Sequence, residues 1–115
     1  MGDVEFLGTH RQELRRGTVV LACLLALRDR GYGYALLDVL AAAGVPVEAN
    51  TLYPLLRRLE SQGLLTSEWD TTEARPRKFY RTSPEGLAIA RELQAEWEGM
   101  GAALRRLDAP EGEVK

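Results

Sequence analysis

Apolar residues recur at helical spacing through much of this chain, and the clearest stripe lies near its middle. Four leucines there fall at positions i, i+3, i+4 and i+7: Leu52, Leu55, Leu56 and Leu59. This spacing places them on one face of a helix, which we predict at about residues 48–62. Gly63 follows, at the position where a helix commonly ends with a glycine in the left-handed conformation.

Two further helices are predicted before this one. The apolar run from Thr18 to Leu27 predicts the buried part of a helix that spans about residues 11–29. A second helix is predicted at residues 34–43, because its leucines face one side and Gly44 and Pro46 close it. Helix, glycine-containing turn, helix, loop and helix is the order of elements in a helix-turn-helix.

The pattern leaves two helix starts open. Residues 1–10 form either a flexible N-terminal arm or an extension of the first helix. Pro54 is tolerated in the first turn of a helix, where the N–H groups lack partners, and bends a helix elsewhere. The third helix therefore either begins close to Asn50 or begins earlier and bends at Pro54.

Two strands are predicted after Gly63, at Leu64–Asp70 and Arg77–Thr82, because both segments contain aromatic residues that favour strands. The six residues between them form the loop of a hairpin. Three basic residues cluster near its tip: Arg75, Arg77 and Lys78. Such a cluster either grips a phosphate backbone or forms a charged edge that prevents aggregation between strands. Beside a polar helix face, we favour the contact with nucleic acid.

A last helix is predicted at residues 83–107. Ser83, Pro84 and Glu85 are typical of a helix start, with a capping serine, a proline at the first position and an acid in the first turn. Its apolar residues are spaced 3, 4, 3, 4, 3, which is the seam of a coiled coil: Ala90, Leu93, Trp97, Met100, Leu104 and Leu107. We expect this seam to form the interface of a homodimer and to pack with the first helix too. An acidic tail at residues 108–115 is expected to be disordered.

The charged residues are unevenly distributed along the chain. The formal net charge is −2, but residues 1–82 hold 11 Lys and Arg against 10 Asp and Glu, whereas residues 83–115 hold 4 against 7. The acidic excess therefore lies outside the segment that carries the polar helix face and the basic hairpin. A small basic footprint suffices for a specific binder, because contacts with bases specify and contacts with phosphates mainly position.

Catalytic chemistry has few groups to use in this sequence. Cys23 is the only cysteine and His10 the only histidine, so no metal site, cofactor site or nucleophilic couple can be assembled. Cys23 lies in the apolar run and is expected in the core. No segment approaches the roughly 20 apolar residues of a membrane span, and we expect a cytoplasmic protein that is not an enzyme.

The polar face of the third helix carries groups that can read DNA. Asn50 can pair with adenine and Arg57 with guanine, each with two hydrogen bonds, while Arg58 on the flank suits a phosphate. The start of the second helix, beside Tyr34, can hold a phosphate through its free amides. The alternative is an ordinary solvated helix face, which is more plausible for Arg58 than for Arg57.

Several motifs in order give the chain a strong resemblance to the PadR family of transcriptional regulators, over roughly residues 14–97. They are Leu14-Arg15-Arg16-Gly17-Thr18, Gly31-Tyr32-Gly33-Tyr34-Ala35-Leu36-Leu37, Thr51-Leu52-Tyr53-Pro54-Leu55-Leu56-Arg57-Arg58-Leu59-Glu60, Gly63-Leu64-Leu65, Arg77-Lys78-Phe79-Tyr80-Arg81-Thr82 and Pro84-Glu85-Gly86. The stretch from Thr51 to Glu60 is the most specific of them.

The resemblance implies a homodimer that binds an inverted repeat in double-stranded promoter DNA, usually as a repressor. It carries DNA contacts over to Asn50, Thr51 and Tyr53 on the third helix, and to Arg77 and Lys78 on the hairpin. The hairpin tip departs from the family, because Glu73-Ala74-Arg75 stands where a glycine is usual.

Taken together, the sequence predicts a mainly α fold with a small β-hairpin. Residues 11–82 form a winged helix-turn-helix DNA-binding domain, in which the hairpin is the wing, and residues 83–107 add one C-terminal dimerisation helix. Trp97 is expected at the centre of the dimer interface. The alternative for Trp97 is a cavity at the dimer seam where a small planar aromatic ligand stacks and releases the DNA.

Two other classes compete with a DNA-binding regulator. A winged helix can serve as a protein-interaction module without affinity for DNA. A small enzyme or ligand carrier is disfavoured by the lack of paired acid and base groups. Among DNA binders, a MarR-type protein is the nearest rival, although that fold uses more of its chain for dimerising helices.

Overall fold

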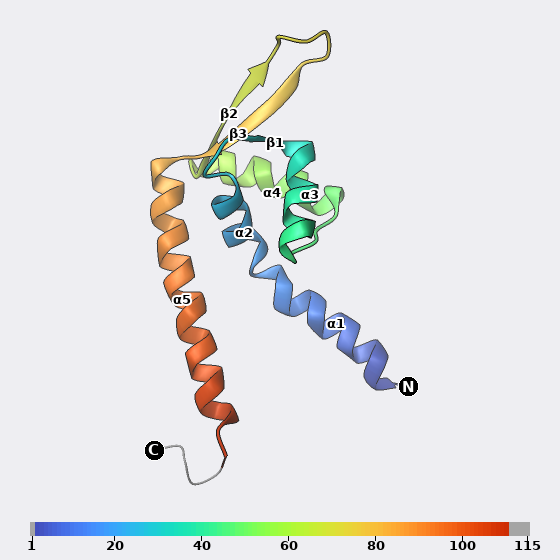
Figure 1. Cartoon of the computed structure of the whole chain (residues 1–115), viewed down its shortest axis with the longest axis vertical. Helices are drawn as coiled ribbons and strands as arrows, with labels where there is room; N and C mark the ends of the chain where they lie inside the picture. The colour runs from blue at the N-terminus through green and yellow to red at the C-terminus, as the bar shows by residue number, and fades with distance from the viewer. Residues whose placement is uncertain (1, 111–115) are drawn as a thin grey trace.

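A computed structural model describes residues 2–110, with side chains described from residue 6 onward. In chain order its elements are α1 (Gly2–Arg16), α2 (Val19–Ala26), β1 (Gly31–Tyr32), α3 (Gly33–Ala43), α4 (Ala49–Ser61), β2 (Leu65–Asp70), β3 (Arg77–Thr82) and α5 (Pro84–Asp108). Figure 1 shows a small body made of α2, α3 and α4, with the β2–β3 hairpin projecting at one end and α1 and α5 at the other. This is the predicted winged helix-turn-helix with one additional C-terminal helix.

The core lies between α2, α3 and α4 and is built mainly from leucines. The stripe predicted on α4 is buried as expected, with Leu52 and Leu56 fully inaccessible. The α2 helix is apolar on every side and contributes Cys23, whose burial raises the pKa of the thiol to about 12. Each fully buried leucine stabilises the fold by about 1.5–3 kcal/mol relative to an exposed one. Cys23 is thus a core residue, as predicted.

The N-terminal part differs from its prediction. One helix was expected at residues 11–29, preceded by a flexible arm or a helical extension; the structure has α1 from Gly2, a turn at Gly17 and Thr18, and then α2. Gly17 favours the interruption, because glycine costs a helix about 1 kcal/mol relative to alanine. The polar α1 and the apolar α2 also need different surroundings. Every described side chain of α1 is exposed.

The sheet contains one strand more than the predicted hairpin. The wing strands β2 and β3 have nearly the predicted bounds, and β1 pairs with the other side of β3, so that the order is β1-β3-β2 and all pairs are antiparallel. Gly31 and Tyr32 were predicted as part of a turn. A strand of two residues shows no alternating pattern, and its partners Tyr80 and Phe79 lie far along the chain.

The helix ends follow the sequence signals. Gly63 has a φ of 79°, the left-handed conformation predicted after α4. The Ser83 side chain accepts a hydrogen bond of 3.0 Å from the backbone N–H of Gly86, which caps α5 as predicted. Pro54 lies inside α4, which begins at Ala49, one residue before Asn50, so the predicted start close to Asn50 is correct. No helix within residues 2–110 is both long and apolar enough to cross a membrane.

The α5 helix is buried only in its first part. Ala90 is buried and Leu93 is half-buried, where α5 packs beside α2 (Figure 1). Beyond them the seam is open in the single chain: Trp97 is 55% exposed and Leu107 is 80% exposed. The helix runs through Asp108, one residue into the predicted tail, and residues 111–115 of that tail lie outside the described part.

Candidate nucleic-acid interface

The exposed face of α4 divides into a centre and two flanks. A helix turns by about 100° per residue, so Asn50, Arg57 and Ser61 share the middle of this face, with Arg57 on its wing side. Tyr53 lies on one flank, toward the wing, and a second set lies on the other side, toward α1: Thr51, Pro54 and Arg58. All of these side chains are exposed except Tyr53, which is half-buried.

An open cleft of about 700 Å³ separates α4 from the wing, and we call it the α4–wing cleft. It brings together six of the nine side chains predicted to contact DNA: Tyr34, Tyr53, Arg57, Arg75, Arg77 and Lys78. Trp69 and Tyr80 complete its wall. The cleft therefore combines four cations with four aromatic rings, and backbone phosphates and sugars can meet both kinds of group there.

The four cations of the α4–wing cleft are not equivalent. Lys78 is 3.5 Å from the carboxylate of Glu60 and lies 5.3 Å from the centre of the Tyr80 ring. Arg57 and Arg75 are exposed, and neither forms an ion pair with another side chain among residues 6–110. Arg57 and Arg75 are thus the cations most available to a polyanion.

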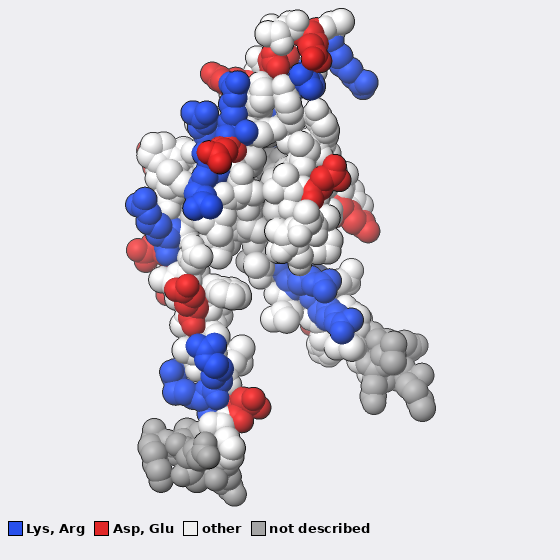
Figure 2. Space-filling model, viewed as in Figure 1, with Lys and Arg blue, Asp and Glu red and all other residues white. Residues whose placement is uncertain are grey.

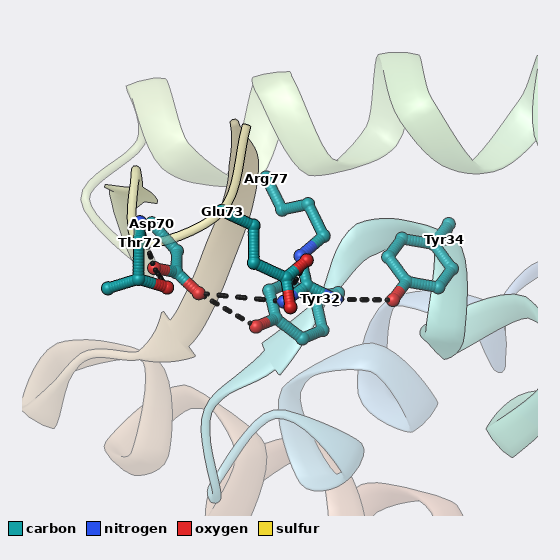
Figure 3. A network of polar contacts seen from close by, with 6 residues as sticks. All are labelled: Tyr32, Tyr34, Asp70, Thr72, Glu73 and Arg77. Carbon is teal, nitrogen blue, oxygen red and sulfur yellow. Dashed lines mark hydrogen bonds and ion pairs between the residues drawn. The ribbon is translucent and has the colours of Figure 1, made fainter. Parts of the chain in front are cut away.

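Arg77 is occupied by contacts within the protein, although it was predicted to contact DNA. Its guanidinium donates a hydrogen bond of 3.2 Å to the Tyr34 hydroxyl and lies 3.2 Å from Glu73 and 3.8 Å from Asp70 (Figure 3). It also stacks 4.2 Å from the centre of the Tyr32 ring. These contacts join the wing to β1 and to the first turn of α3. We infer that Arg77 positions the wing.

Asp70 is the other centre of this network. Its carboxylate accepts hydrogen bonds from the backbone N–H and the hydroxyl of Thr72, at 3.1 and 2.7 Å, and from the Tyr32 hydroxyl at 2.9 Å. The Thr72 bonds, together with that from Tyr32, hold the pKa of Asp70 below its ordinary value of 3.8. Burial, followed by the bond to Asp70, raises the pKa of Tyr32.

We predict that Asp70 contributes a stability that disappears in acid. A pKa lowered by folding stabilises the native state above the ordinary value of 3.8, and this stabilisation is lost as the pH falls through the folded value. Asp70→Asn should therefore lower the free energy of unfolding at pH 7 and reduce its fall below about pH 4. Urea unfolding at pH 7, 5 and 3 measures both effects. Asp38→Asn, an exposed site on α3, is the control; equal pH profiles for both variants would contradict the prediction.

The second flank of α4 borders a groove of about 840 Å³ that lies against the end of α1, and we call it the α1–α4 groove. Thr51 and Arg58, both predicted to contact DNA, line this groove with Arg15 and Arg16 of α1. Asn50, the ninth predicted residue, is exposed in the first turn of α4 and lines neither hollow. The nine residues thus spread across the α4 face and both of its sides.

Sequence reasoning missed several members of this interface. Trp69 was used only as a strand signal, although the alternation of a strand places it on the same face as Lys78, its partner in the register. The network carboxylates Asp70 and Glu73 were missed although some of their partners are close in the sequence, Thr72 for Asp70 and Arg77 for Glu73; only Tyr32 comes from a distant element. Within the described residues, no three His, Cys, Asp or Glu side chains gather as metal ligands.

Comparison with known proteins identifies the family. The model of the transcriptional regulator PadR-like family matches residues 20–92. The transcriptional regulator Rv3488 of Mycobacterium tuberculosis is 39% identical over 82 residues, which are 70% of this chain and 77% of that protein.

Solved structures agree with this match. A PadR family transcriptional regulator from Eggerthella lenta is 51% identical, with a TM-score of 0.88 over 93% of this chain and 96% of that one. A transcriptional regulator from Clostridium thermocellum is 26% identical, with a TM-score of 0.74 over 82% of this chain and 96% of that one. The chain belongs to the PadR-like family of transcriptional regulators.

Proposed function

We propose that this winged-helix regulator acts as a homodimeric repressor that binds an inverted repeat in promoter DNA. The observation that carries the proposal is the polar face of α4, bordered on the wing side by the exposed cations Arg57 and Arg75. A helix that presents amide, hydroxyl and guanidinium groups beside a cationic wing fits a major groove and its bordering phosphates.

The exposed seam of α5 supports the homodimer. Trp97, Met100 and Leu104 are each more than half exposed in the single chain, although their spacing is that of a coiled-coil interface. A second copy would cover these side chains. The two-fold axis of such a dimer would place two α4 helices in successive major grooves, about 34 Å apart.

We assign separate roles to the DNA-facing residues. Asn50 and Arg57 read bases, with Thr51 and Tyr53 beside them, because they lie on the face of α4 that is turned away from the core. Arg75 and Lys78 contact phosphates from the wing, Arg58 contacts them from α4, and Tyr34 does so at the start of α3. Arg77 orients the wing through the contacts of Figure 3.

A small planar aromatic effector is a further part of the proposal. Trp97 is 55% exposed on the seam, where it would meet its symmetry mate across a dimer. A flat ligand stacked between the two rings would release DNA only if it favoured a different spacing of the α4 helices. The simpler role of Trp97 is that of an interface residue. Quenched Trp fluorescence together with weaker operator binding across a panel of planar aromatics supports the effector; no change in either contradicts it.

Selection of bound duplexes from a random DNA pool tests the proposed function. An enriched inverted repeat with half-sites about one helical turn apart would support a dimeric, sequence-specific regulator. If the folded protein enriched no motif, the proposal would fail, and the chain would be better explained as a winged-helix protein-interaction module. Reporter expression from a promoter that carries the selected repeat then distinguishes repression from activation.

A further inference from the structure

The end of α1 carries basic side chains that no role described so far uses. Arg15 and Arg16 occupy the last turn of α1 and line the α1–α4 groove together with Arg58. Figure 2 shows basic side chains gathered where α1 joins the body of the molecule. Figure 1 places this junction on the opposite side of the body from the wing.

These three guanidiniums are exposed, and no carboxylate among the described side chains pairs with them. Among the ion pairs formed by the side chains of residues 6–110, none involves Arg15, Arg16 or Arg58. Glu48 also lines the groove, but it forms no ion pair with any of the three. The floor beneath them is apolar, made by Val19, Leu55 and their neighbours. The groove therefore presents an excess of positive charge along one rim of α4.

The geometry of a major groove explains why α4 has cations on both sides. A major groove is about 12 Å wide and is bordered by two phosphate backbones, one on each side of an inserted helix. The α4–wing cleft supplies Arg75 and Lys78 on one side of α4, and the α1–α4 groove supplies Arg15, Arg16 and Arg58 on the other. A single cationic side would hold only one of the two backbones.

We propose that Arg15 and Arg16 of α1, with Arg58 of α4, bind the DNA phosphate backbone on the side of the major groove opposite the wing. This inference rests on the proposed function, because it assumes that α4 enters a major groove. It assigns a DNA-binding role to the helix that precedes the helix-turn-helix. It also links operator binding to the turn at Gly17 and Thr18, which sets the direction of α1 relative to α4.

The salt dependence of operator binding tests the inference, with the selected operator as the probe. In the double variant Arg15→Gln/Arg16→Gln, a dimer loses four arginines. The slope of log Kobs against log[KCl] should decrease in magnitude by about 0.9 for each phosphate that is no longer neutralised, which is roughly 2 to 4 in total. Affinity at 0.1 M KCl should fall at least about tenfold. The preferred sequence should stay the same, because phosphate contacts carry no sequence information.

A matched control is available on α5. Arg105 and Arg106 form the same dipeptide in the last turn of another helix, and both are exposed. Arg105→Gln/Arg106→Gln therefore removes equal charge and the same favourable interaction with a helix C-terminus. We expect it to keep the wild-type slope.

Each other outcome of this experiment has a definite meaning. If the Arg15/Arg16 variant and the control have equal slopes, the proposed phosphate contact does not exist. If the Arg15/Arg16 variant becomes monomeric in sedimentation, the α1–α4 groove is a contact between copies of the chain, and the inference is wrong. If the wild-type protein binds no duplex at all, the proposed function itself fails, a result that is visible before any variant is compared.

Discussion

Arg57→Glu is expected to abolish binding to the operator while leaving the fold intact. Arg57 is exposed on α4, lines the α4–wing cleft and has no ion pair within the described residues, so the substitution breaks no internal ion pair there. A good pairing between arginine and guanine contributes about 1–3 kcal/mol of discrimination. Two half-sites double this to about 2–6 kcal/mol, or at least about 30-fold in affinity. The new carboxylate adds repulsion from the phosphates.

Fluorescence anisotropy with a labelled operator duplex measures this decrease in affinity, and circular dichroism checks the fold. Arg81→Glu is the matched control, because it makes the same charge change at an exposed position that lines neither the cleft nor the groove beside α4. It should weaken binding only slightly, through the change in net charge. If the two variants bound the operator equally well, Arg57 would not contact DNA, and the base contact proposed here for α4 would be wrong.

The parts of this structure that follow local rules could be predicted from the sequence. The α4 helix has a complete leucine stripe and a terminating glycine, and its predicted bounds are within one residue of Ala49–Ser61. The wing strands and the capped start of α5 were found for the same reason. In each case the residues that predict the element lie within it or next to it, so contacts with distant segments do not override the prediction.

The parts that were missed either depend on contacts between distant segments or lie beside a stronger local pattern. The β1 strand exists because Gly31 and Tyr32 pair with Tyr80 and Phe79 of β3. The direction of α1 depends on the turn at Gly17 and Thr18. The sequence did not indicate this turn, because the apolar run that follows predicted one continuous helix.

The candidate site shows the same division. The spacing of residues on α4 predicted which of its side chains are exposed and available to DNA, because a helix converts spacing directly into direction. The roles of the basic residues on the wing could not be predicted from their spacing in the same way. Arg77 lies beside Lys78 and Arg75 in the sequence and was given the same role, but the structure gives it partners from α3, β1 and the wing loop. A basic residue in a sequence carries no mark of whether its charge is already paired.

Gly86→Ala is expected to have the largest effect on stability among glycine-to-alanine changes in the described part of the chain. A Cβ at Gly86 would overlap the carbonyl oxygen of Leu64 and lie 2.7 Å from the Thr82 side chain. Neither neighbour can move freely: the Leu64 carbonyl accepts the Ser83 N–H at 3.0 Å, and the Thr82 hydroxyl donates to the Leu24 carbonyl at 2.7 Å. The added methyl group must therefore shift α5 away from the sheet or break these bonds.

We expect Gly86→Ala to lower the free energy of unfolding by about 3 kcal/mol, the upper part of the range for an overpacked site. Gly99→Ala is the control in the same helix, since a Cβ there meets nothing within 4 Å. Alanine is favoured over glycine in a helix, so this variant should be stabilised by up to about 1 kcal/mol. Thermal unfolding at one fixed protein concentration compares the two, because the proposed dimer would make stability depend on concentration. If Gly86→Ala were as stable as the wild type, α5 could not be seated against the Leu64 carbonyl, and the position of α5 relative to the sheet would have to be different.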